Sequence, residues 1–123
     1  MNQIGLYISS AMTALWGIAH LLATRGVVAN FGDITTDSRR IITMEWIVEG
    51  VALISTAAFV AVAAVIQPES DVSSAVFGVA IWTLIALAVV SLFTGFRVSF
   101  LPFRLCPLVL GAAAVLIAWA RWF

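Results

Sequence analysis

The sequence contains no lysine, one histidine and one cysteine, and charged residues make up only 10% of its 123 residues. An ordinary soluble domain carries about 25% charged residues. With no lysine and a formal net charge of zero, the chain lacks the basic surface on which nucleic-acid binding depends. The single cysteine, Cys106, excludes an intrachain disulfide and a Cys-x-x-Cys redox pair, and leaves only an intermolecular bond or a lone thiol. The absences therefore argue against a nucleic-acid-binding protein and a disulfide scaffold.

Hydrophobic residues dominate the chain instead, at 63%. Four apolar runs cover residues 4–23, 41–66, 72–95 and 103–122. Each run can cross about 30 Å of hydrocarbon as a helix, which takes roughly 20 residues. The sequence therefore predicts a single all-α domain, an integral membrane four-helix bundle with no room for a soluble catalytic domain. Because the first arginine follows the first run, we expect that run to be a retained span rather than a cleaved signal peptide.

The connections between the runs predict the topology. Pro68 and its polar neighbours predict a tight turn between the second and third runs. Residues 25–40 form a longer polar loop, in which Thr35–Ser38 offers caps for the second helix. Together with the basic and aromatic segment over residues 96–104, this loop carries five of the six arginines. The positive-inside rule then predicts an inner-membrane protein with both termini outside the cytoplasm.

Three ionisable residues inside the spans, His20, Glu45 and Glu49, are the strongest candidates for function. Such residues are costly in a membrane and usually face the interior of a helical bundle. Glu45 and Glu49 are four residues apart, on one face of the second helix, and His20 lies at a similar depth in the first. Two neighbouring carboxylates in a low dielectric cannot both ionise cheaply. We therefore expect an acid and a base side by side, with His20 as relay, in one pocket open to the inner leaflet.

Other polar and aromatic residues at this depth are candidates for lining the pocket. Tryptophan in a span packs against neighbouring helices more often than it lines a binding site. A structural alternative is that Glu45 pairs with Arg97 or Arg104 and Glu49 with His20, only to fix the register of the helices. The candidate ligand-binding residues are Trp16, Trp46, Trp82, Thr13, Arg97, Arg104 and Cys106.

The sequence gives little support to a metal centre or a hydrolase. His20 with two carboxylates has the composition of a facial triad, but there is no second histidine and too few soft ligands, so we expect no functional metal. No cofactor is indicated. The aspartates Asp33, Asp37 and Asp71 all lie in expected loops, away from His20, which argues against a Ser-His-Asp triad.

Two segments carry a resemblance to a known family. Residues 17–22, Gly-Ile-Ala-His-Leu-Leu, lead through Phe31 to residues 45–54, Glu-Trp-Ile-Val-Glu-Gly-Val-Ala-Leu-Ile. This stretch resembles the small four-helix DoxX-like membrane proteins, with Glu49-Gly50 in the place of a Glu-x-x-Gly-like segment. The resemblance implies a four-helix membrane subunit, in some cases associated with quinone-linked or other redox systems. By chemistry alone, the acid, acid and histidine set is also similar to that of membrane sterol isomerases of the emopamil-binding type.

Taken together, these observations predict a protein that binds an apolar small molecule, such as an isoprenoid, a quinone or a sterol-like lipid. It would be a lipid isomerase or a subunit associated with an oxidoreductase. The first alternative is a non-catalytic accessory subunit or scaffold of a membrane complex. The second is a small proton-coupled transporter, which at this size would need an oligomer to build a path. Small residues in the spans suit a homo-oligomer or a partner in a membrane complex.

Overall fold

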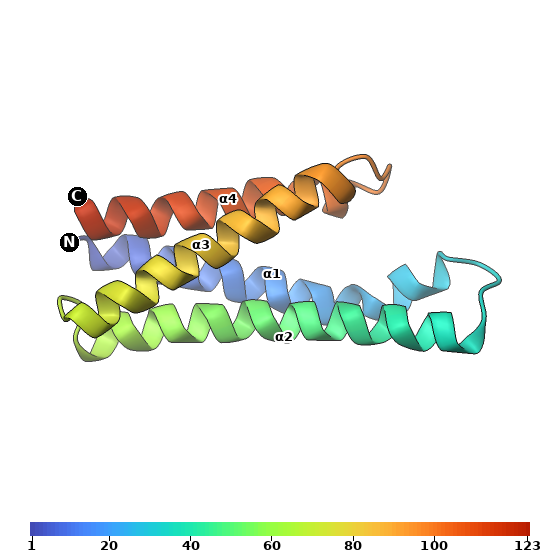
Figure 1. Cartoon of the computed structure of the whole chain (residues 1–123), viewed down its shortest axis with the longest axis horizontal. Coiled ribbons are helices and arrows are strands. Elements are labelled where there is room, and N and C mark those ends of the chain that lie inside the picture. The colour runs from blue at the N-terminus through green and yellow to red at the C-terminus, as the bar shows by residue number, and fades with distance from the viewer.

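A computed structural model describes all 123 residues as four helices joined by short connections (Figure 1). The helices are α1 (Gln3–Ala29), α2 (Thr36–Ile66), α3 (Asp71–Thr94) and α4 (Leu101–Trp122), and there is no strand. Each helix is long and apolar enough to cross a membrane. The all-α four-helix bundle that the sequence predicts is therefore confirmed.

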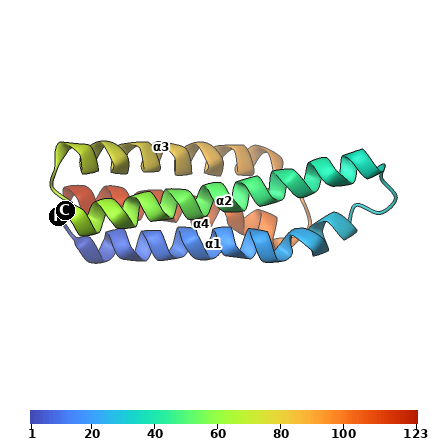
Figure 2. The same ribbon diagram turned by 90° about the horizontal axis from the view of Figure 1, so that it is seen from below.

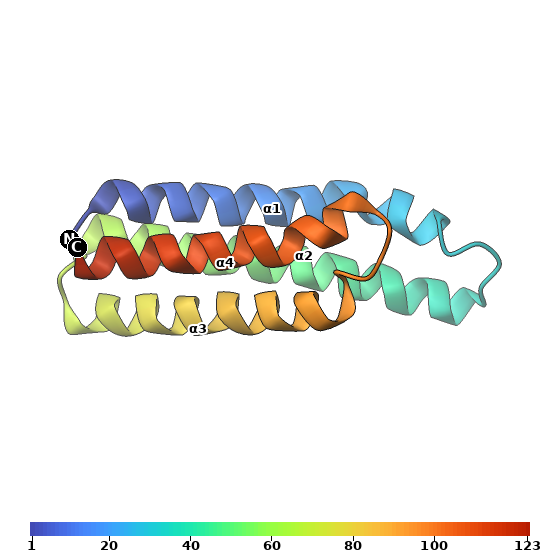
Figure 3. The same cartoon turned by 90° about the horizontal axis from the view of Figure 1, so that it is seen from above.

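The helices α1 and α2 are longer than the apolar runs that predicted them. α1 continues past residue 23 to Ala29, and α2 begins at Thr36 rather than at residue 41. The expected polar loop over residues 25–40 is therefore wrong in extent, because the connection spans only residues 30–35. Helical backbone satisfies its own hydrogen bonds in water as well as in lipid, so a change from apolar to polar residues does not end a helix. The α1–α2 hairpin consequently projects beyond α3 and α4 (Figure 3).

The ends of the helices are fixed by residues that the sequence points to. The Thr35 hydroxyl accepts a hydrogen bond from the Ser38 backbone N–H at 3.1 Å and caps α2, as predicted. The Ser70 hydroxyl caps α3 in the same way, through the Ser73 N–H at 3.1 Å. α4 has no side-chain cap, but Pro102 stands in its first turn, where a missing N–H costs nothing.

The four helices run alternately up and down, and each packs against two neighbours. α1 contacts α2 and α4, and α3 contacts α4 and, less extensively, α2. Both termini lie at one end of the bundle together with the α2–α3 turn (Figures 1 and 2). The connections over residues 30–35 and 95–100 lie at the other end, so the five arginines that lie in or near them are at the same end of the bundle.

The tightly packed core occupies the half of the bundle nearest the termini. The buried residues of α2 all lie at or after Gly50, and those of α3 all lie at or before Leu84. The Ser9 hydroxyl ties α1 to α4 in this half by donating to the Ala113 carbonyl at 3.0 Å. Toward the other end α3 leans away from α2 and toward α4 (Figure 1). The bundle is therefore tightly packed at the terminal end and loosely packed at the opposite end.

Large apolar side chains cover the outside of the bundle. Leu22 is 80% exposed, Trp82 73% and Phe93 72%. A soluble monomer rarely exposes continuous apolar surface on this scale, whereas hydrocarbon solvates it. The exposed surface thus fits a multi-pass membrane protein.

Two glycines bring α1 and α2 into backbone contact just where the candidate residues lie. A Cβ atom built on Gly17 would stand 2.8 Å from the Gly50 carbonyl oxygen, and one built on Gly50 would stand 2.9 Å from the Gly17 oxygen. Only residues without a side chain permit this approach. His20 follows Gly17 by one turn and Glu49 precedes Gly50, so the glycine contact sets the distance between them.

Candidate functional site

A cavity of about 800 Å³ lies in the loosely packed half of the bundle, and residues of all four helices line it. Its walls are mostly hydrophobic, with contributions from Val27 on α1, Ala52 on α2, Leu87 on α3 and Phe103 on α4. Ligand pockets typically have volumes of about 300–1,000 Å³ and apolar walls with a few polar groups. The cavity therefore has the size and lining of a site for a small apolar molecule.

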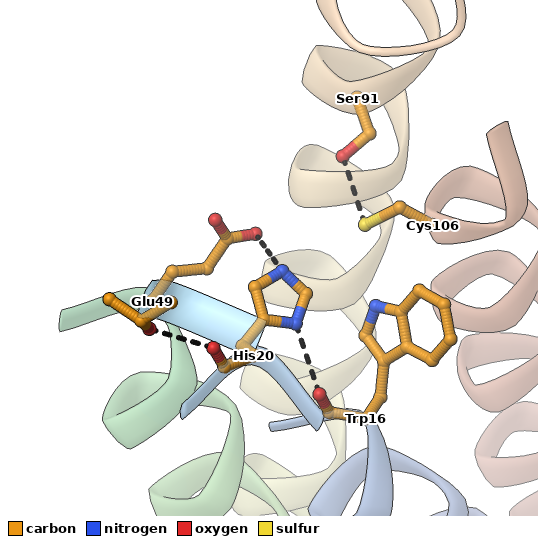
Figure 4. Close-up of polar contacts among 6 residues, drawn as sticks. Trp16, His20, Glu49, Ser91 and Cys106 are labelled. Atoms are coloured by element: carbon orange, nitrogen blue, oxygen red, sulfur yellow. Dashed lines mark hydrogen bonds and ion pairs between the residues drawn. The ribbon is translucent and has the colours of Figure 1, made fainter. Parts of the chain in front are cut away.

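His20 is the polar group held most firmly in this cavity. The residue is only 8% exposed, and its ring stacks on the indole of Trp46 with centroids 4.8 Å apart and planes at 25°. Its Nδ1 lies 3.0 Å from the Trp16 carbonyl oxygen (Figure 4). A carbonyl can only accept a hydrogen bond, so Nδ1 carries a hydrogen and donates it. This contact fixes the ring and turns Nε2 toward α2.

Glu49 faces His20 from α2. Its Oε1 lies 3.5 Å from His20 Nε2, and its side chain is 35% exposed. Because the hydrogen of a neutral ring is already on Nδ1, Nε2 offers a lone pair to a carboxylate that also offers lone pairs. Two acceptors face each other stably only when a proton or another cation lies between them. The His20–Glu49 pair is therefore arranged to hold a proton or another cation between its two facing atoms.

Cys106 completes the polar cluster from α4. Its Sγ and the facing atoms of His20 and Glu49 all lie within 4.8 Å of one another. The Ser91 hydroxyl on α3 lies 3.4 Å from the same sulfur. The indole N–H of Trp16 is buried without a hydrogen-bond partner and points toward the sulfur (Figure 4). Groups from all four helices thus converge on one point of the cavity wall.

Glu45 lies apart from this cluster. It lines the same cavity, but it is exposed, and its carboxylate takes part in no ion pair and no side-chain hydrogen bond. The expected closely coupled pair of carboxylates is replaced by a pair of Glu49 with His20. Of the structural alternative, the structure shows the pair of Glu49 with His20, but Glu45 pairs with neither Arg97 nor Arg104.

The other candidates divide into two groups. Trp16, Trp46 and Cys106 line the cavity. The structure does not bring the remaining four to it: Thr13 is buried in the packed half, Trp82 faces outward, and both arginines are exposed beyond the cavity walls. Arg104 donates from Nε to the Val98 carbonyl at 3.1 Å, which holds the α3–α4 connection rather than a carboxylate. These four positions correct the expected list of pocket residues: Thr13, Trp82, Arg97 and Arg104.

Sequence reasoning missed two contributors to the site. Phe103 packs edge-on against Trp46, with ring centroids 5.4 Å apart, and so extends the aromatic wall from α2 to α4. The Gly17–Gly50 contact sets the spacing of the helices that carry His20 and Glu49. In the sequence, the aromatic content of residues 96–103 could have pointed to Phe103. Gly17, one turn before His20, and Gly50, next to Glu49, could have pointed to the helix contact.

No protein-family model, no curated protein and no solved structure matches the chain. The assignment of a function therefore depends on the chemistry of the cavity itself.

Proposed function

We propose that the protein binds an apolar small molecule with one polar end, of the isoprenoid, quinone or sterol-like lipid class, in the cavity between its four helices. The single observation that carries this proposal is the combination of mostly hydrophobic walls around about 800 Å³ with one polar cluster at His20 and Glu49. The apolar body of the ligand would fill the space between Val27, Leu87 and Phe103. Its polar end would meet the cluster.

The route into the cavity supports a ligand that is dissolved in the membrane. Val48 on α2 and Val90 on α3 both line the cavity and are 56% and 58% exposed. α3 leans away from α2 toward this end of the bundle (Figure 1). A lipid-soluble molecule can therefore enter sideways from the hydrocarbon without crossing water.

Acid–base chemistry is the reaction class that the polar cluster offers to such a ligand. A proton between His20 Nε2 and Glu49 Oε1 lies next to the cavity and can pass to or from a ligand atom there. Glu45, at the exposed edge of the cavity, would exchange protons with the surroundings. A lipid isomerase would use these transfers directly, and a subunit associated with an oxidoreductase would use the same groups to hold a quinone, in line with the resemblance to DoxX-like proteins.

The arginine distribution favours an inner-membrane location with the cavity at the cytoplasmic side. Arg39 and Arg40 lie near the start of α2, Arg97 lies in the α3–α4 connection and Arg104 lies near the start of α4, all at the end opposite the termini. The positive-inside rule assigns that end to the cytoplasm and both termini to the other side. The cavity would then open at the level of the inner leaflet.

The test is mass spectrometry of lipids and small molecules that co-purify with the protein in mild detergent. We expect one defined apolar compound with the wild type and its loss in Trp46→Leu, which removes an aromatic wall and the support of His20. Trp82→Leu is the matched control, because Trp82 faces outward, and it should retain the compound.

Glu49→Gln separates binding from architecture, because its amide N–H can still donate to Nε2 and hold the helices together. If folded Glu49→Gln loses the compound, this result supports the placement of the polar end of the ligand at Glu49. The pocket proposal fails if no compound is enriched with the wild type. In that case, loss of a protein partner in the variants favours an accessory subunit, and proton-coupled solute flux in liposomes favours a transporter.

A further inference from the structure

Three side chains of different chemical type meet at the cavity wall in an arrangement that suits a metal ion. His20 Nε2, Glu49 Oε1 and Cys106 Sγ come from α1, α2 and α4, and all lie within 4.8 Å of one another. Imidazole nitrogen, carboxylate oxygen and thiolate sulfur are the three donor types that proteins use for zinc. The sequence analysis considered only His20 with the two glutamates and expected no functional metal, whereas the structure brings Cys106 rather than Glu45 to His20 and Glu49.

The spacing within the cluster fits a metal better than a hydrogen bond. A charge-assisted N–H···O bond spans about 2.7–2.9 Å, whereas His20 Nε2 and Glu49 Oε1 are 3.5 Å apart. Two donors bound tetrahedrally at about 2.0–2.1 Å would be separated by about 3.3 Å. Cys106 then needs only a side-chain adjustment to reach the same centre. The two lone pairs that face each other would both be directed at the ion.

The groups around the cluster match what a metal centre requires of its surroundings. Metal-bound histidines usually donate their second N–H to a carbonyl or carboxylate, which fixes the ring, and His20 Nδ1 donates to the Trp16 carbonyl at 3.0 Å. The indole N–H of Trp16 is buried, lacks a partner and points toward Cys106 (Figure 4). A thiolate at Cys106 would give this N–H an acceptor, and the Ser91 hydroxyl, 3.4 Å from the sulfur, would supply a second donor.

We propose that His20, Glu49 and Cys106 form a three-ligand site for a divalent transition-metal ion of the zinc class, with its fourth coordination position open to the cavity. Binding releases the thiol proton of Cys106 as the metal–sulfur bond forms, and the ion displaces the proton between His20 Nε2 and Glu49 Oε1. Magnesium and calcium are disfavoured because they prefer oxygen ligands, and copper(I) because the site offers only one sulfur. The ion would cross-link α1, α2 and α4 at the loosely packed end of the bundle.

The open position extends the proposed function, on which this part of the inference rests. Catalytic zinc sites hold three protein ligands and leave the fourth place to water or substrate. A hydroxyl or carbonyl oxygen at the polar end of an apolar ligand could occupy that place. The three-ligand site itself stands on the geometry of the cluster and does not require that ligand.

The test uses cobalt(II) as a spectroscopic probe on the full-length protein, purified in detergent without a histidine tag and freed of metal by a chelator. We expect one equivalent of cobalt to produce a thiolate-to-cobalt charge-transfer band in the near ultraviolet, and zinc to abolish the band by competition. Cys106→Ser should lose the band entirely. Glu49→Gln should weaken binding at least tenfold, and Trp16→Phe, which removes the indole N–H, about 10–100-fold.

Glu45→Gln is the matched control, because it removes a carboxylate from the same cavity but from outside the cluster, and its band should equal that of the wild type. Absence of the band in folded wild type overturns the inference, and so does binding of equal strength in Cys106→Ser. Co-purifying compounds are measured on portions of the same preparations taken before the chelator is added. A retained compound without a cobalt band refutes the metal site alone, and a band without any compound refutes the apolar pocket alone.

Discussion

Replacing Gly17 by alanine is expected to force α1 and α2 apart and so disrupt the site. The added Cβ would lie 2.8 Å from the Gly50 carbonyl oxygen and 3.1 Å from the Ile54 nitrogen, and ordinary van der Waals contact begins at 3.4 Å. Both neighbours are backbone atoms, which cannot rotate away as a side chain can. The helices must therefore separate by several tenths of an ångström, and the 3.5 Å gap between His20 and Glu49 must widen with them.

The energetic cost follows from two opposing effects. Overpacking of a well-packed interface costs about 1–3 kcal/mol. Alanine in a helix interior gains about 0.5–1 kcal/mol over glycine. We therefore expect Gly17→Ala to lower the free energy of unfolding by about 1 kcal/mol, and to reduce retention of the co-purifying compound.

The assay is reversible unfolding in mixed detergent micelles, followed by circular dichroism. Gly111→Ala and Gly78→Ala are matched controls, because a Cβ on either glycine would have nothing within 4 Å, and both should be as stable as the wild type or slightly more stable. If Gly17→Ala proves as stable as these controls and keeps the compound, the close helix contact does not set the geometry of the site.

Two further predictions concern the end of the bundle at which the termini lie and the orientation of the protein in the membrane. Arg121 donates to the Ser74 hydroxyl at 2.8 Å, so Arg121→Ala and Ser74→Ala should each lower the free energy of unfolding by about 1 kcal/mol, and the double variant by no more than either alone. In a Cys106→Ala background, Asp33→Cys in the α1–α2 connection should react with a membrane-impermeant maleimide only after the cells are opened. Glu69→Cys in the α2–α3 turn should react in intact cells. The reverse labelling pattern would overturn the orientation given by the arginines.

The helices could be predicted from the sequence because each depends on a property that is local in the chain. Runs of apolar residues long enough to span hydrocarbon gave four helices, and Pro68 and Thr35 marked the turn and the cap correctly. The ends of α1 and α2 near the first connection could not be predicted in this way. Val27 and Val28 are only 5% and 6% exposed, and that burial beyond the expected end of the span depends on tertiary packing.

The sequence could predict how far along each helix the site residues lie, but not which way each side chain faces around the helix axis. Counting residues from the ends of the spans placed His20 and Glu49 at one level, and the structure joins them. The same count could not separate Glu45 from Glu49, because residues four apart share a helix face. It also could not show that Trp82 turns outward, since every face of α3 is apolar and no periodicity marks the buried one.

The glycine contact explains why Glu49, rather than Glu45, became the partner of His20. At Gly50 the backbone of α2 touches that of α1, so its neighbour Glu49 is held within reach of a residue one turn beyond Gly17. Glu45 lies one turn further along α2, toward the end at which the packed core gives way to the cavity and the exposed connection. The Glu49 carboxylate is paired with a residue of α1, whereas the exposed Glu45 carboxylate has no partner on another helix. In an apolar bundle, the positions of small residues therefore decide which of two chemically identical side chains is held in the polar cluster.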